Sequence, residues 1–188
     1  MEQKSTFWRT AMIYGLYIGV VIMLFSVILY VTGQTQNTTL GYLSFLIYGA
    51  AIVVAQILYR NREMGGYITY SQALGFGVAI MLFSGIVTAL YTIILYSFID
   101  PTLVDQMKAM QEEAMLQKGM SEDQIEAAMA IASKMMTPAW MSIMGLLGSV
   151  FIGTIISLIS SVFIKKQPNE DAFDEAMEEI KPEDTSIE

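Results

Sequence analysis

The sequence predicts an all-α fold, an integral membrane four-helix bundle. Hydrophobic residues make up 54% of the 188 residues and charged residues only 15%, against about 25% in soluble domains. The mean hydropathy of +0.51 points the same way. Four segments lack Asp, Glu, Lys and Arg and are long enough to cross a hydrocarbon core of about 30 Å as helices: residues 10–31, 40–59, 73–99 and 139–164.

The first apolar segment follows Lys4 and Arg9, as the apolar part of a signal peptide would. It is longer than the ~7–15 apolar residues usual in signal peptides, and no small-x-small cleavage motif follows it. We therefore expect this segment to stay in the mature protein as a membrane span.

The positions of Lys and Arg predict the orientation of the four spans. Short basic loops stay in the cytoplasm, and the loop at residues 32–39 carries no charge. We therefore expect both termini in the cytoplasm and residues 100–138 on the outer side. The basic residues that flank the spans are Lys4, Arg9, Arg60, Arg62, Lys165 and Lys166.

The connector between the third and fourth spans is predicted to form a helical hairpin over residues 101–137, outside the cytoplasm. Asp100 and Pro101 are typical of a helix start, and Gly119 is typical of a left-handed helix end. A capping box from Ser121 then begins a second helix. The two helices are expected to pair with each other or to lie on the outer membrane surface.

Small residues recur at helical spacing within the spans. Close backbone approach and hydroxyl hydrogen bonds drive helix association in lipid, so we expect these residues at helix contacts, with a substrate path as the alternative. The predicted helix-packing residues are Gly15, Gly19, Gly77, Gly85, Gly145, Ser149, Gly153 and Ser157.

The first and third spans resemble each other in sequence. Residues 16–26 and 74–84 are identical at eight of eleven positions, and the second and fourth spans align more weakly, Gly41 with Gly145 and Gly49 with Gly153. The match predicts two parallel two-helix repeats, related by an axis along the membrane normal.

Residues 167–188 differ in composition from the spans. Half of all acidic residues lie in this segment, where Lys181 is the only base. We expect a cytoplasmic acidic tail that follows a transmembrane domain at residues 1–166. The negative charge argues against binding to nucleic acid or anionic lipid.

Several motifs together resemble the domain-of-unknown-function 4199 family of bacterial membrane proteins. They are Gly-Tyr-Ile-Thr-Tyr-Ser-Gln-Ala-Leu-Gly at residues 66–75, Tyr-Ser-Phe-Ile-Asp-Pro at 96–101, Gly-Met-Ser at 119–121, and the run 153–166. The resemblance covers about residues 5–166. It implies a four-helix protein of the bacterial cytoplasmic membrane with uncharacterised activity, and it supplies no catalytic residues to carry over.

The sequence contains neither cysteine nor histidine. Thiol and imidazole catalysis are therefore excluded, as are most zinc, haem and iron–sulfur sites. We expect no enzyme, no cofactor and no metal, but a scaffold or accessory subunit that contacts membrane lipid and either a second copy or a membrane-protein partner. Gln56 is expected to bond a neighbouring helix rather than a ligand.

The alternative function is a small transporter or channel subunit built from the two repeats. Such a protein needs an intramembrane charge or a broken helix to bind coupling ions, and the spans contain neither charge nor proline. Ser84, Thr88, Ser149 and Ser157 would line its polar path, and an aqueous cavity would favour it.

Overall fold

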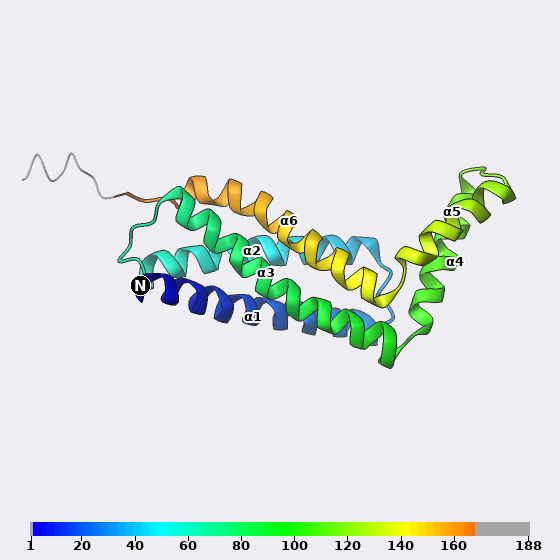
Figure 1. The fold of residues 1–188 in the computed structure, drawn as a ribbon, viewed down its shortest axis with the longest axis horizontal. Coiled ribbons are helices and arrows are strands. Elements are labelled where there is room, and N and C mark those ends of the chain that lie inside the picture. Colours follow the sequence, from blue (N-terminus) through cyan, green and yellow to red (C-terminus); the bar gives the residue numbers. More distant parts are fainter. Residues whose placement is uncertain (1, 168–188) are drawn as a thin grey trace, which may run out of the picture.

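The computed structural model describes residues 2–167 and is helical throughout this range, apart from its connecting segments and one isolated β-bridge. The all-α prediction is confirmed. The elements are α1 (Glu2–Val31), α2 (Thr38–Arg62), α3 (Tyr70–Ile94), the π-helical turn η1 (Leu95–Ile99), α4 (Thr102–Gln117), α5 (Glu122–Met135) and α6 (Pro138–Ile164). The long helices α1, α2, α3 and α6 run side by side, and α4 and α5 extend from one end of this bundle (Figure 1).

Four helices have the length and apolar composition needed to cross a membrane. They cover Thr6–Val31, Thr38–Arg62, Tyr70–Ile99 and Pro138–Ile164, so each contains the whole of one predicted span. Asn37 caps α2 by accepting from the amides of Thr39 and Leu40 at 3.0 and 3.2 Å. Thr69 begins α3 through a capping box with Gln72.

The central helix is α3, which packs most extensively against α6 and next against α1. α1 and α3 run in the same direction, whereas α2 and α6 run in the opposite direction (Figure 1). Phe76 of α3 is fully buried and stacks on Tyr59 of α2 with ring centroids 3.9 Å apart. Phe7 of α1 meets both rings edge-on.

The end of the bundle that carries the N-terminus also carries Arg60 and Arg62 of α2 and the two lysines that follow α6, and we call it the basic end (Figure 1). Ile68 and Lys166 exchange backbone hydrogen bonds at 2.9 and 3.0 Å. Arg60 Nη1 donates to the carbonyl oxygen of Ile164 at 3.1 Å. These bonds fix the α2–α3 loop and the last turn of α2 against the end of α6.

α4 and α5 pack against each other at the opposite end of the bundle, which we call the α4–α5 end. α4 begins one residue later than predicted, because its N-cap is Pro101, without a side-chain capping bond, and Asp100 lies before the cap. Asp100 Oδ1 still accepts from the Thr102 amide at 3.2 Å. Gly119 has a φ of +76°, the left-handed conformation predicted for it. A capping box at Ser121 begins α5 as predicted. The predicted acidic tail lies outside the described residues, except for Gln167.

Candidate functional site

Small residues set the packing of α3 against α6. A Cβ atom added at Gly77, Gly85 or Gly153 would lie closer to a side chain of the facing helix than real Cβ atoms lie to any neighbour. The missing side chains let the backbones approach, which strengthens helix association in lipid. We call the six facing residues the α3–α6 seam; in layers four residues apart they pair Gly77 with Ser157, Met81 with Gly153, and Gly85 with Ser149.

Gly15 and Gly19 set the packing of α1 against α3. A Cβ atom at Gly15 would lie 2.5 Å from Phe83 Cβ and 2.7 Å from the Ile80 carbonyl oxygen. One at Gly19 would lie 2.7 Å from Val87 Cβ. All three separations are shorter than ordinary van der Waals contact, so α1 reaches this distance from α3 only because both positions are glycine.

Gly145 is placed differently from the other seven predicted packing residues. A Cβ atom there would meet no atom within 4 Å, apart from atoms of its own helix nearby, and the residue is exposed. The close approach predicted at Gly145 from the small-residue spacing is therefore absent. Its place is taken by a pocket that Gly145 lines.

Gln56 joins three helices at the basic half of the bundle. Its fully buried amide donates from Nε2 to the Ala73 carbonyl oxygen at 2.9 Å and to Ser161 Oγ at 3.4 Å. Its Oε1 accepts from Ser160 Oγ at 2.7 Å. Both ends of the amide are thus satisfied, which matters because an unpaired polar group in hydrocarbon costs several kcal/mol. The prediction that Gln56 bonds neighbouring helices is confirmed.

The two predicted repeats run in matching directions but pack differently. α3 and α6 pack closely, whereas α1 and α2 make few contacts. In the alignment of the repeats, Val27 takes the place of Gly85 and Phe45 takes the place of Ser149. These larger side chains do not allow the close backbone approach seen in the α3–α6 seam, so only one repeat is tightly closed.

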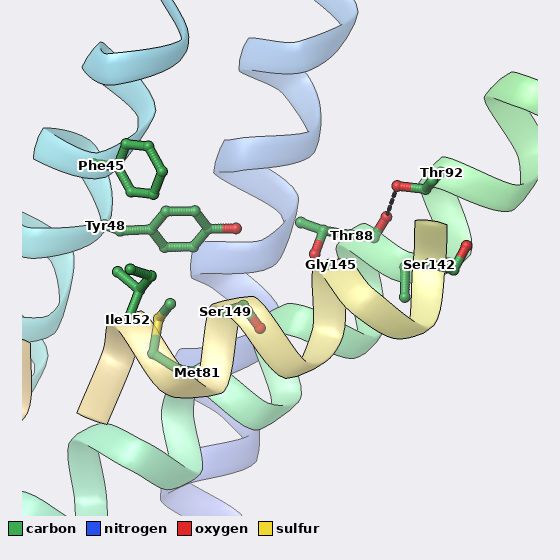
Figure 2. A pocket seen from close by; sticks show the side chains of 11 residues that line it. Phe45, Tyr48, Met81, Thr88, Thr92, Ser142, Gly145, Ser149 and Ile152 are labelled. Atoms are coloured by element: carbon green, nitrogen blue, oxygen red, sulfur yellow. Dashed lines mark hydrogen bonds between the residues drawn. The ribbon is translucent and has the colours of Figure 1, made fainter. Parts of the chain in front are cut away.

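A pocket of about 380 Å³ lies between α2, α3 and α6, in the half of the bundle nearer the α4–α5 end. Figure 2 shows Tyr48 of α2 projecting into it, with its hydroxyl directed toward the side of Thr88. Sequence reasoning proposed Thr88 and Ser149 for a polar path, but it gave no sign of where this pocket lies. Its lining residues are Phe45, Tyr48, Met81, Thr88, Ala89, Thr92, Ser142, Gly145, Gly148, Ser149 and Ile152.

Four hydroxyl groups of the pocket already donate to carbonyl oxygens of their own helices. Thr88 donates to Gly85 at 3.1 Å, and the other three donate at 2.6 to 2.9 Å. A hydroxyl has one proton and two lone pairs, so each of them still offers acceptor capacity. The other three are Thr92, Ser142 and Ser149.

Only part of the polar path proposed for a transporter is present. Thr88 and Ser149 line the pocket, but Ser84 and Ser157 are fully buried and do not line it. Ser157 faces Gly77 in the α3–α6 seam. The four residues therefore do not share one cavity.

Residues 2–167 contain no group of three or more Asp, Glu, His or Cys side chains placed to hold a metal ion. On the surface of α4, Lys108 Nζ forms a salt bridge with Asp105 Oδ1 at 3.0 Å. Asp105 lies in the first turn of α4, and Asp100 lies just before the helix, where its Oδ1 accepts from the Thr102 amide.

Four apolar helices that pack through small residues, with one buried amide among them, define a multi-pass helical membrane protein. The chain belongs to the family of proteins of unknown function designated DUF4199, which it matches over residues 13–166. Searches of curated proteins and of solved structures found no match.

Proposed function

We propose that this protein is a non-enzymatic scaffold or accessory subunit of the bacterial cytoplasmic membrane. The observation that carries the proposal is the α3–α6 seam, where glycines and serines bring two backbones together through three layers. Conducting or ion-coupled proteins need polar groups at membrane depth that are free to replace water around the solute. Here the interior amide of Gln56 bonds other helices, and the predicted spans contain no Asp, Glu, Lys or Arg to hold a coupling ion.

The surface proposed for recognition is the helical hairpin of α4 and α5 on the outer side of the membrane. Leu103, Val104 and Ile125 are buried there, whereas Met110 and Ile131 remain 48% and 65% exposed. Apolar side chains left in water favour a partner surface or the membrane interface. This supports a second copy or a membrane-protein partner at the α4–α5 end.

The proposed orientation follows from the basic end, since Lys and Arg are retained in the cytoplasm. We expect membrane-impermeant maleimide to label Gly119→Cys in intact cells, because Gly119 lies in the turn between α4 and α5. Ser5→Cys and Thr185→Cys should be labelled only after the cells are permeabilised. Labelling of either terminal cysteine in intact cells, with Gly119→Cys spared, would show the opposite orientation.

A small transporter or channel subunit is the second candidate, and the pocket lined by Thr88 and Ser149 favours it. We expect the purified protein in liposomes to catalyse no uptake driven by an imposed proton or sodium gradient, because no Asp, Glu, Lys or Arg lies in the predicted spans. The measurement uses amino acids, sugars and metal ions as solutes. Gradient-dependent uptake that is lost in Thr88→Leu would overturn the scaffold proposal and establish the transporter.

A further inference from the structure

We propose that the pocket between α2, α3 and α6 binds a neutral amphiphile from the bilayer, an apolar molecule that carries a hydroxyl group. This inference goes beyond the scaffold role and does not depend on it. The volume of about 380 Å³ falls in the lower part of the roughly 300–1,000 Å³ range of small-molecule sites. It therefore suits a compact or single-chain molecule rather than a whole phospholipid.

The position of the pocket along α6 makes the bilayer its source of ligand. Ser142 lies four residues and Ile152 fourteen residues beyond Pro138, so at 1.5 Å per residue the pocket extends from ~6 Å to ~21 Å below that end of the helix. It thus reaches from near one interface to about the middle of a ~30 Å hydrocarbon core.

The pocket is open on the α6 side because two of its lining residues there are glycines, which have no side chain. Gly145 and Gly148 line it, both are exposed, and a Cβ atom at either position would meet nothing within 4 Å. On the α2 side, Phe45 is 48% exposed. Gln56 ties α2 to α3 and α6 in the basic half of the bundle, whereas in the half nearer the α4–α5 end the pocket lies between the same three helices. Its exposed lining residues give lateral access from lipid.

The polar atoms of the pocket select the class of ligand. The hydroxyls of Thr88, Thr92 and Ser149 donate their protons to carbonyl oxygens of their own helices. Toward a ligand they therefore act as hydrogen-bond acceptors through their lone pairs. Tyr48 adds a hydroxyl directed into the same space (Figure 2). These acceptors favour a ligand that supplies a donor, such as a hydroxyl group, and the Tyr48 hydroxyl can donate to or accept from the same group. The ligand must also be uncharged, because no Asp, Glu, Lys or Arg lines the pocket to compensate a charge.

Photolabelling of the full-length protein in lipid nanodiscs tests the proposal. The probe is a long-chain primary alcohol with a diazirine in its chain, compared with the matching alkane and the matching carboxylic acid. We expect the alcohol to label peptides of α2 and α6 that line the pocket, and unlabelled alcohol to compete. The alkane and the acid should label these peptides weakly and without saturation.

Two variants and a control make the test specific. Gly145→Leu adds a side chain to the lining of the pocket at a position where a Cβ atom meets nothing within 4 Å, and we expect it to reduce saturable labelling about tenfold or more, which corresponds to 1.4 kcal/mol of binding free energy. Gly75→Leu is the matched control, an exposed glycine away from the pocket with nothing within 4 Å, and labelling should not change. Tyr48→Phe removes one hydroxyl and should reduce labelling about two- to tenfold.

The proposal fails if labelling is unsaturable and spread evenly over the lipid-facing helices in every variant. Equal saturable labelling by the alkane and the alcohol, unchanged in Tyr48→Phe, would assign the pocket to ordinary acyl chains and overturn the hydroxyl requirement. Stronger labelling by the carboxylic acid would overturn the neutral class. If Gly145→Leu does not fold, Tyr48→Phe still decides the outcome, since it leaves the apolar ring in place.

Discussion

Gly153→Leu is expected to lower the free energy of unfolding by about 3 kcal/mol, the upper part of the 1–3 kcal/mol usual for overpacking. A Cβ atom at this position would lie 2.6 Å from Met81 Cβ, which is fully buried and cannot move without its backbone. The leucine would therefore push α3 and α6 apart. The layers at Gly77 and Gly85 would lose contact at the same time. The measurement is the thermal unfolding of the purified variant in mild detergent.

Gly148→Leu on the same helix is the matched control for this prediction. A Cβ atom there meets nothing within 4 Å, and leucine is a better helix former than glycine by up to about 1 kcal/mol. We expect the control to unfold at or slightly above the wild-type temperature. The double variant Gly153→Leu/Met81→Ala should recover part of the loss, because it restores room in the middle layer. Equal unfolding temperatures for Gly153→Leu and Gly148→Leu would show that the seam does not hold the helices together.

The α3–α6 seam shows how much of the helix packing can be predicted from the spacing of small residues in the sequence. Gly77 and Gly85, eight residues apart, share a face of α3, and Ser149, Gly153 and Ser157 share a face of α6. Spacing cannot show where a ladder stops facing its partner. Gly145 continues the same four-residue series, yet it faces open space because α2 supplies Phe45 and Tyr48 on that side instead of a close backbone.

Thr88 and Ser149 could be proposed for a polar path from the sequence, but the position and walls of the pocket could not, for a physical reason. Its hydroxyls are common in membrane helices, where they bond the preceding turn, and each one has that ordinary role here. What makes a pocket is the separation of α2 from α6 over a few turns. That separation depends on the difference between the repeats, such as Phe45 in the place of Ser149, and on the positions of three helices at once.

Gln56 could be assigned to helix contacts from the sequence, but its partners could not. They lie 17, 104 and 105 residues away along the chain, at Ala73, Ser160 and Ser161. The amide takes part in all three bonds because α2, α3 and α6 converge near the basic end. A glutamine in a predicted span indicates a polar contact, and only the bundle geometry shows that this contact joins three helices.

Gln56→Met should destabilise the protein by about 2 kcal/mol, because it removes three interhelical hydrogen bonds worth on average about 0.6 kcal/mol each in membrane proteins. Methionine keeps the unbranched shape and about the same buried volume as glutamine. The loss of unfolding free energy therefore measures the hydrogen bonds and not a new cavity. Thermal unfolding in mild detergent gives the comparison. A double-mutant cycle with Ser160→Ala isolates the 2.7 Å bond to Oε1 and should give a coupling energy of about 0.6 to 1.7 kcal/mol. Additive effects of the two substitutions, together with a wild-type unfolding temperature for Gln56→Met, would show that this amide does not hold α2 to the α3–α6 pair.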